Sequence, residues 1–382
     1  MSADNVNLKK FSVAVIAGDG IGPEVIDEAR HVVDAAASLD GASFEWVQYP
    51  FGASHYLKTG EVLPESAISE MGRHSAMMLG AIGDPAVKPG ILERGILLTL
   101  RFVFDQYVNL RPAVSLPNVP TPVPLNGGRI DSVVVRENTE DLYMGLGAVT
   151  KDGRLTAPLD LERGAYSLRG ELKISASKDF PFAAQVALNT HPGVSRIARY
   201  ACETARKRGE KRVTIVTKSN AVPALYGFFE DVAKDIISSE FPEIASEIVN
   251  VDALCYHLVR TPTAYGVLLC PNLFGDIVSD LQAGLAGGMG AAAGGNIGDG
   301  LSMFEPVHGS APDIAGTGRA NPIAAILSGA MMLRHMNLEK SALAVERAVS
   351  DYLESAKKSE LPFEFAGEAS CRQVGDAVVK KI

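Results

Sequence analysis

Short runs of strand-forming residues alternate with amphipathic segments along much of this chain. Such runs occupy residues 12–18, 44–49, 212–218 and 265–270, and each is followed by apolar residues at helical spacing. Because strands that alternate with helices are typical of parallel sheets, the pattern predicts an α/β protein with largely parallel strands. The clearest helix is predicted at 23–38, where proline takes the first helical position.

Two segments depart from this alternation. Residues 144–185 alternate polar and apolar side chains between turn-forming residues, which predicts a β-rich excursion from the main body. An exposed excursion of this kind commonly needs a partner to cover its strand edges, so a dimer is expected. Residues 283–300 are rich in glycine and alanine and are interpreted as close-packed turns near a ligand.

Length and composition predict a globular protein of about two domains, with 382 residues of which 47% are hydrophobic and 21% charged. The 36 basic and 45 acidic residues give a net charge of −9, which offers no broad cationic surface to nucleic acid or anionic lipid. The best candidate for a membrane span, residues 322–333, is shorter than the roughly 18 residues that a span needs.

The cysteines and the N-terminus favour the cytoplasm. The four cysteines are scattered, without metal-binding spacing or the density of a secreted disulfide scaffold, so reduced thiols are expected. Residues 1–18 lack a cleavage pattern and are interpreted as a tail leading into a first strand.

The glycine cluster at 18–25 follows a predicted strand and opens a predicted helix, as a dinucleotide-binding loop does. Its spacing differs from the Rossmann pattern, because the third glycine falls one residue early at Gly22 and Pro23 takes the required place. The cluster therefore favours a turn, although the helix N-terminus beyond it could meet an anionic or polar ligand.

Three arginines are candidates for binding carboxylates. Arg101 and Arg111 flank an aromatic and apolar segment, and Arg136 opens a polar stretch directly after a predicted strand. A guanidinium group donates two parallel hydrogen bonds to a carboxylate and stays charged at any relevant pH. Any one of them alone is more often an ordinary surface or ion-paired residue, so their combination carries the interpretation.

Asp276 and Asp280 lie four residues apart in a predicted helix, so their carboxylates share one face. Like charges at this spacing cost about 0.2–0.5 kcal/mol unless something compensates them. A divalent cation would do so, and a solvated acidic face is the alternative. Oxygen ligands favour Mg²⁺ or Mn²⁺ over zinc, and Asp252 could add a third carboxylate.

Two further residues are candidates for proton transfer. Lys218 ends a predicted apolar strand. A lysine at this place either extends its charged group to solvent or has a functional role in a cleft at the carboxyl end of the strand. Tyr143 follows Arg136 by seven residues. Partial burial among charges could tune either group for proton transfer, although each alone is more often a packing residue.

Residues 305–322 are rich in turn formers and precede a predicted helix, so a long ordered loop is expected. His308 in this loop could cap a turn or contact a nucleotide base. Asp313 favours NAD over NADP if a nucleotide binds, because a carboxylate accepts hydrogen bonds from a ribose diol and repels a 2′-phosphate.

Seven motifs, taken in order, resemble the β-decarboxylating dehydrogenases of isopropylmalate, isocitrate, homoisocitrate and tartrate or D-malate. The resemblance spans nearly the whole chain and is weakest at 144–190. The motifs are GDGIGPEV, LRFVFDQYVNLRP, RENTEDLY, TKSN, NVDALCYHLVR, NLFGDIVSDL and EPVHGSAPDIAG.

This resemblance implies an open two-domain α/β fold without a Rossmann domain. It implies a cofactor-binding domain from residues 1–106 and 287–382, a substrate and dimerisation domain from 107–286, and a β-rich dimerisation arm at about 144–190. It also implies a homodimer with shared active sites, because Lys218 and Asp252 would reach into the site of the neighbouring subunit.

The resemblance further implies roles for individual residues. Lys218 would help to remove the substrate's hydroxyl proton, and Tyr143 would reprotonate the enol; Asp252 would act with them. The substrate carboxylates would be held by Arg101, Arg111 and Arg136, and Mg²⁺ or Mn²⁺ by Asp252, Asp276 and Asp280. NAD would be bound by Ile21, Asn220, Glu305, His308, Gly309, Ser310, Ala311, Asp313, Ile314 and Asn321.

The substrate itself is less well defined by the motifs. Leu97 and Leu98 resemble the apolar pair with which isopropylmalate dehydrogenases contact the substituent on the malate, and Gly95 stands where isocitrate enzymes have a hydroxyl residue. Residues 136–143 resemble isocitrate dehydrogenases more, and residues 105–112 the tartrate and D-malate group. We therefore expect 3-isopropylmalate, with isocitrate, homoisocitrate, tartrate, D-malate or a specialised 3-substituted malate as alternatives.

A noncatalytic regulatory subunit of a heteromeric isocitrate dehydrogenase is the alternative of another class. Such subunits lose members of the site, whereas every expected residue is present here.

Overall fold

The computed structural model describes residues 9–382, so most of the predicted N-terminal tail lies outside the described residues. The chain divides into two compact units. The terminal unit contains the chain up to Gln106, Arg111–Ile130 and Gln282–Ile382, and the middle unit contains Tyr107–Leu110 and Asp131–Leu281. The assignment of cofactor and substrate binding to separate domains stays a prediction.

The sheet of the terminal unit is mainly parallel. Strand β1 pairs in parallel with β2 and β3, and β16 is parallel to β3 and antiparallel to β15. The centre of β1 is buried on both faces, as expected for a parallel strand covered by helices. The strands are β1 (Lys9–Gly18), β2 (Ala42–Gln48), β3 (Ala76–Ala81), β15 (Ala293–Ile297) and β16 (Met303–Pro306).

Helices pack on this sheet, and α1 confirms the predicted helix at 23–38. It spans Gly22–Ala37, has proline in its first turn, and buries the apolar residues that recur at helical spacing. The other helical segments of the unit are η1 (Ser38–Asp40), α2 (Ala53–Thr59), α3 (Glu65–Met71), η2 (Glu93–Leu98), α4 (Thr99–Val103), η5 (Met289–Ala291), η6 (Pro312–Ile314), α9 (Ile323–His335), α10 (Glu339–Ser355), η7 (Lys358–Glu360), η8 (Phe363–Phe365) and α11 (Cys371–Val379).

The middle unit repeats the parallel α/β arrangement, with β12 between β13 and β14, and β5 on the far side of β14. Its strands are β5 (Asp131–Glu137), β12 (Arg212–Thr217), β13 (Ala245–Asn250) and β14 (Val267–Cys270). Its helical segments are η3 (Asp141–Met144), α5 (His191–Arg208), η4 (Pro223–Gly227), α6 (Phe228–Glu240), α7 (Val251–Arg260) and α8 (Asn272–Ala286). Both α8 and β4 (Val108–Val114) contribute residues to each unit.

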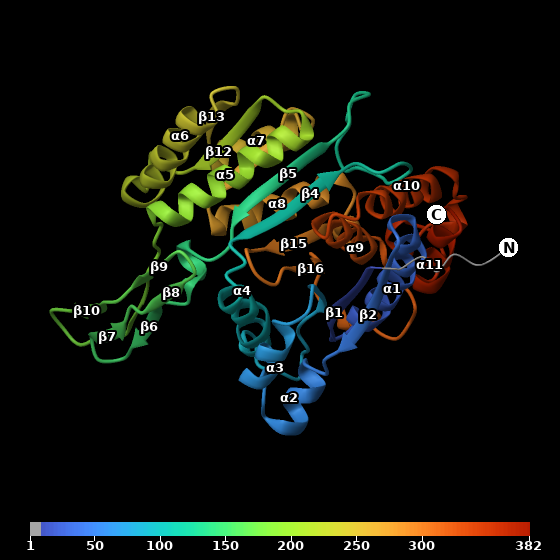
Figure 1. The fold of residues 1–382 in the computed structure, drawn as a ribbon. Coiled ribbons are helices and arrows are strands. Elements are labelled where there is room, and N and C mark those ends of the chain that lie inside the picture. The colour runs from blue at the N-terminus through green and yellow to red at the C-terminus, as the bar shows by residue number, and fades with distance from the viewer. Residues whose placement is uncertain (1–8) are drawn as a thin grey trace. The chain divides into compact units, whose positions relative to one another are not determined.

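An arm of short antiparallel hairpins extends from the middle unit, which confirms the predicted β-rich excursion (Figure 1). In it β7 pairs with β10, β6 with β11, and β8 with β9. The strands are β6 (Gly147–Thr150), β7 (Arg154–Pro158), β8 (Leu161–Arg163), β9 (Tyr166–Leu168), β10 (Glu171–Ser175) and β11 (Phe182–Gln185).

The interpretation of residues 283–300 as turns was wrong in part. Helix α8 continues to Ala286, and residues 293–297 form the buried strand β15. Small residues suit this strand because a Cβ atom at Gly295 would lie 3.1 Å from the Phe304 ring on the neighbouring strand. Among residues 9–382, no helix is long and apolar enough to cross a membrane.

Candidate active site

The terminal unit contains a pocket of about 150 Å³ that gathers residues from four parts of the sequence. Six of the predicted site residues line it: Leu97, Arg101, Arg111, Glu305, His308 and Gly309. Leu98, the second leucine of the predicted apolar pair, is half-buried but does not line the pocket. The pocket thus combines two guanidinium groups with an apolar side chain.

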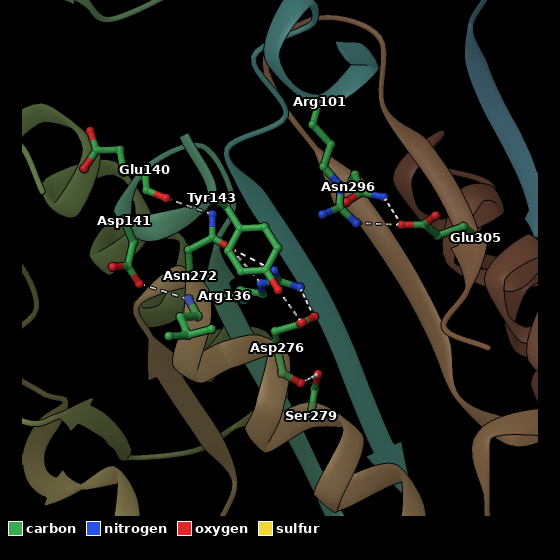
Figure 2. A network of polar contacts seen from close by, with 11 residues as sticks. Arg101, Arg136, Glu140, Asp141, Tyr143, Asn272, Asp276, Ser279, Asn296 and Glu305 are labelled. Carbon is green, nitrogen blue, oxygen red and sulfur yellow. Dashed lines mark hydrogen bonds and ion pairs between the residues drawn. The ribbon is translucent and has the colours of Figure 1, made fainter. Parts of the chain in front are cut away.

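Arg101 is fixed in this pocket by a buried ion pair. The residue is 3% exposed, and Nη2 donates a 3.0 Å hydrogen bond to Glu305 Oε1. Asn296 on β15 donates a 2.7 Å hydrogen bond to the same oxygen (Figure 2). The sequence motifs gave no role to Asn296, which pairs with Glu305 only because β15 and β16 are adjacent strands.

The segment before Arg101 forms a π-helical turn, Glu93–Leu98. A π turn holds one residue more than an α turn and is frequent at functional sites. A Cβ atom at Gly95 would lie 2.6 Å from Val62 Cγ1, so a larger residue here would displace that side chain. Leu97 in this turn lines the pocket, whereas its neighbour Leu98 does not.

The glycine cluster is held against the loop that begins at Val307. A Cβ atom on Gly20 would lie 1.9 Å from the Ser310 carbonyl oxygen, and φ at Gly20 is +57°, so glycine is required on both grounds. Ile21 N donates to Ser310 O at 2.9 Å, and Gly316 N donates to Glu24 Oε1 at 2.6 Å. The two loops that carry most of the predicted NAD residues therefore form one ordered surface.

His308 has an acceptor atom that points to a ligand. Its Nδ1 lies 3.0 Å from the Gly309 carbonyl oxygen, which can only accept, so Nδ1 carries the proton and Nε2 is an acceptor when the ring is neutral. Desolvation lowers the pKa of His308, which favours the neutral ring. Nε2 is buried and has no hydrogen-bond partner within residues 9–382.

The remaining predicted cofactor residues occupy the same loop or its continuation. Ala311 and Asp313 are exposed, and Ile314 is half-buried. Asn321 is buried, and its Nδ2 donates a 2.9 Å hydrogen bond to Glu364 Oε2. Glu364 also accepts from Gly290 N, so it ties Asn321 to the turn before β15, a role that no sequence motif indicated.

In the middle unit, Arg136 at the end of β5 is 1% exposed and has fixed partners (Figure 2). Its Nε and Nη2 donate to Asn272 Oδ1 at 3.0 and 2.8 Å, and its Nη1 donates to Asp276 Oδ1 at 2.5 Å. A Cβ atom on Gly275 would lie 2.5 Å from Arg136 Cγ, which explains the glycine in the first turn of α8. Asn272 lies in one of the seven motifs, but no role was predicted for it. Its spacing from Asp276 places both side chains on one face of the helix.

Tyr143 shares Asp276 with this arginine. Its hydroxyl donates a 2.7 Å hydrogen bond to Asp276 Oδ2, and its ring centroid lies 4.9 Å from the Arg136 guanidinium carbon. Asp276 therefore receives a guanidinium on one oxygen and a phenol on the other. The structure brings together three of the predicted site residues in one hydrogen-bonded group.

The segment between Arg136 and Tyr143 is a buried acidic loop. Glu137, Glu140 and Asp141 are each at most 1% exposed. Desolvation raises the pKa of all three carboxyls, and the pKa of Glu137 rises to about 7 with a further contribution from nearby Glu140. Each carboxylate accepts several hydrogen bonds, as buried charges require.

Lys218 and Asp252 form the second polar group of the middle unit. Lys218 follows β12 directly, Asp252 lies in the first turn of α7, and Lys218 Nζ donates to Asp252 Oδ1 at 2.7 Å. This hydrogen bond lowers the pKa of Asp252. Asn220 is exposed, two residues beyond Lys218.

The predicted metal ligands are not gathered within one chain. Asp276 and Asp280 are one turn apart on α8, where Asp276 is half-buried and Asp280 is exposed. In the described part of the chain, no cluster of three or more His, Cys, Asp or Glu side chains could hold a metal ion. Asp252 does not join the other two aspartates there.

One known protein family matches nearly the whole chain. Residues 12–378 match the family model described as isocitrate/isopropylmalate dehydrogenase. The chain belongs to the isocitrate/isopropylmalate dehydrogenase family. This confirms the resemblance drawn from the seven motifs.

Members of this family resemble the chain over its full length. A 3-isopropylmalate dehydrogenase of Clavibacter sepedonicus is 42% identical over 381 residues, which cover 98% of each protein. One of Thermobifida fusca is 40% identical over 386 residues, covering 100% of this chain and 99% of the relative. The crystal structure of an isocitrate dehydrogenase from Methylococcus capsulatus has a TM-score of 0.82 and 34% identity, covering 97% of this chain and 99% of that one. The predicted fold class is confirmed.

Proposed function

We propose that this protein catalyses the NAD- and divalent-metal-dependent oxidative decarboxylation of a 3-substituted (2R)-malate, with 3-isopropylmalate as the substrate. The observation that carries the proposal is the pocket in which Leu97 lies with Arg101 and Arg111. Guanidinium groups suit the carboxylates of a malate, and a leucine suits an alkyl substituent. The names of the relatives at 40–42% identity support the same substrate.

The three arginines hold the substrate carboxylates in this proposal. Arg101 and Arg136 are buried and already fixed by acceptors, so they are preorganised rather than mobile. Preorganised donors do not have to be reoriented when the substrate binds, which lowers the cost of reaching the reactive geometry. Arg111 supplies a second guanidinium to the pocket of the terminal unit.

The acidic residues of α8 fit a divalent cation. Asp276 and Asp280 offer oxygen ligands one turn apart, which suits Mg²⁺ or Mn²⁺, and Asp252 of the neighbouring subunit would complete the set. A bound cation stabilises negative charge on the oxygen at C2 of the substrate. Within residues 9–382 the three aspartates form no metal-binding cluster, so this proposal requires Asp252 of a second copy.

The lysine and the tyrosine move protons. Lys218, paired with Asp252, would help to remove the proton of the C2 hydroxyl as hydride leaves C2. Loss of the carboxylate on C3 as CO₂ leaves an enol, and Tyr143 donates a proton to its C3. The hydrogen bond from Tyr143 to Asp276 orients the phenol for this transfer.

The terminal unit fits a nicotinamide dinucleotide. The buried, unpartnered acceptor on His308 suits the exocyclic amine of adenine, and the exposed carboxylate of Asp313 suits a ribose diol. Ile21, Glu305, Gly309, Ser310, Ala311, Ile314, Asn321 and, in the middle unit, Asn220 complete the proposed contacts. NAD⁺, when bound, accepts the hydride from C2.

A homodimer completes the proposal. The middle unit exposes apolar side chains on β13, α7 and α8 that a second copy would cover, and the arm exposes Val149 and Phe180. These apolar residues are Ile248, Tyr256, Val259 and Ile277. We further propose a cytoplasmic location, since all four cysteines are free and three of them are buried.

The test measures Mg²⁺-dependent NAD⁺ reduction by the purified protein with 3-isopropylmalate, isocitrate, D-malate and tartrate side by side. Preference for 3-isopropylmalate by at least tenfold in kcat/KM supports the proposal. Preference for another of the four would replace the substrate but keep the reaction. No turnover with any of them would favour a specialised malate or the noncatalytic alternative, and binding of NADH without turnover would separate these two.

A further inference from the structure

Glu140 joins the arm of the middle unit to the polar group around Tyr143. It is fully buried, and its carboxylate accepts three hydrogen bonds. Tyr166 on arm strand β9 donates its hydroxyl to Oε1 at 2.5 Å, and Thr190 Oγ1 donates to the same oxygen at 2.5 Å. Thr190 N donates to Oε2 at 2.8 Å. One donor thus comes from the arm and two come from the start of α5.

The backbone of Glu140 continues this connection toward the site. Its carbonyl oxygen accepts a 3.0 Å hydrogen bond from Asn272 Nδ2. Asn272 Oδ1 in turn accepts the two hydrogen bonds from Arg136, and Arg136 and Tyr143 both bind Asp276 (Figure 2). An unbroken series of contacts therefore runs from the arm hydroxyl to the hydroxyl that we propose as proton donor.

The Glu140 carboxylate has little room to move. A Cβ atom on Gly193 would lie 2.1 Å from Glu140 Oε1, so only glycine admits the carboxylate at this place. A buried carboxylate that loses a donor and cannot shift to find another carries an uncompensated desolvation cost. Loss of the Tyr166 hydroxyl would therefore destabilise the present arrangement of Glu140 and of the loop that ends at Tyr143.

We propose that Tyr166 is a positioning residue, whose hydrogen bond to Glu140 holds the loop 137–143 so that Tyr143 is aligned for proton donation. The inference rests on the proposed role of Tyr143. It gives the arm a part in catalysis in addition to its proposed part in dimerisation, because an arm strand supplies a donor to the segment that carries the acid.

The test is a double-mutant cycle between Tyr166→Phe and Tyr143→Phe. Tyr166→Phe should lower kcat about tenfold and leave KM for the substrate within about twofold, since it removes only alignment. In the Tyr143→Phe background the same substitution should change kcat less than twofold, because the group that it aligns is gone. Tyr265→Phe is the control, since the Tyr265 hydroxyl makes no hydrogen bond within residues 9–382 and its loss should leave kcat unchanged.

Equal losses from Tyr166→Phe in both backgrounds would overturn the proposal and leave the hydroxyl a purely structural role. An unchanged kcat in Tyr166→Phe alone would also overturn it. Should that variant not accumulate as folded protein, Glu140→Gln takes its place in the cycle, with the same loss of effect expected in the Tyr143→Phe background.

Amide hydrogen exchange separates this inference from the proposed function, because it needs no turnover. Residues 138–144 should exchange at least fivefold faster in Tyr166→Phe than in the wild-type protein, while residues 212–217 of β12 keep their rates. Unchanged exchange in the loop would overturn the inference even for an active enzyme. An inactive wild-type protein would instead count against the proposed substrate or activity and leave the exchange result unaffected.

Discussion

The hydroxyl of Tyr143 donates a 2.7 Å hydrogen bond to Asp276 Oδ2, while Arg136 binds the other oxygen of the same carboxylate. Asp276 thereby connects the proposed proton donor, a proposed substrate-binding arginine and the proposed metal site. A change at any of the three affects the others through this carboxylate. Separate tests are needed to assign one role to each.

Tyr143→Phe tests the proton-donating role. The substitution keeps the ring near Arg136 and removes only the hydroxyl, so KM should stay within about threefold while kcat falls by about 10²–10⁴-fold, the usual contribution of a general acid. Steady-state kinetics with 3-isopropylmalate measure both. Wild-type kcat in the variant would remove Tyr143 from the mechanism.

Lys218→Met tests the role of the lysine in removing the hydroxyl proton. Turnover should nearly vanish, by more than about 10²-fold, because methionine fills similar space but has no amine to take part in proton transfer. Lys211→Met is the matched control, since Lys211 is exposed at the opposite end of β12. Circular dichroism and gel filtration should show both variants folded and in the wild-type oligomeric state. Comparable losses in both variants would contradict a specific role for Lys218.

Asp280→Asn tests the metal site. The variant should need at least tenfold more Mg²⁺ for half-maximal rate, because one anionic ligand is lost from α8. Calorimetric titration with Mn²⁺ should show the same loss of affinity in the absence of substrate. Asp231→Asn on α6, also an exposed helical aspartate, should leave both values unchanged. Equal metal affinity in wild type and Asp280→Asn would exclude Asp280 as a ligand.

Local sequence patterns predicted the elements well where one local signal dominates. The helix α1 has proline at its start and apolar residues at helical spacing, and the arm shows alternation without helical period. The spacing of Asp276 and Asp280 likewise predicted that both side chains lie on one face of α8. These features depend only on residues that are close together in the sequence, so they can be predicted from the sequence alone.

The partners of the site residues depend on contacts between distant segments and were not predictable in this way. Asn296 bonds Glu305 because two strands pair, and Glu140 meets Tyr166 because the arm folds back onto the loop. The π turn at Glu93–Leu98 has no signature in apolar spacing, and the sequence did not show that Leu97 but not Leu98 would line the pocket. Strand β15 was missed because its small residues mimic turn formers.

Asp313→Lys combined with Ile314→Tyr tests the proposed adenosine site. Replacing the carboxylate with an ammonium group removes an acceptor for the ribose diol and favours a 2′-phosphate, so the ratio of kcat/KM for NADP to that for NAD should rise at least tenfold. Asp351→Lys, at an exposed aspartate of α10, should leave the ratio unchanged. An unchanged ratio in the double variant would argue against this placement of the ribose.

Glu137→Gln tests whether the buried acidic loop makes stability depend on pH. Desolvation raises the pKa of Glu137 from 4.5 to about 7 in the folded protein, so the folded state binds this proton more tightly than the unfolded chain does. The stabilisation is fully present below pH 4.5 and is lost as the pH rises toward 7. A pKa difference of one is worth about 1.4 kcal/mol, so the full rise corresponds to at most about 3–4 kcal/mol.

Thermal unfolding at pH 5, 6, 7 and 8 and fixed protein concentration measures this dependence. The apparent Tm of the wild-type protein should fall between pH 5 and 7, and Glu137→Gln should show a smaller fall, because glutamine does not titrate. The variant should also be less stable at pH 5, since its amide nitrogen cannot accept the hydrogen bond that Glu140 N donates. Glu162→Gln, at an exposed glutamate of the arm, should keep the wild-type slope. Parallel Tm profiles for wild type and Glu137→Gln would show that the buried carboxyl does not take up the proton on folding.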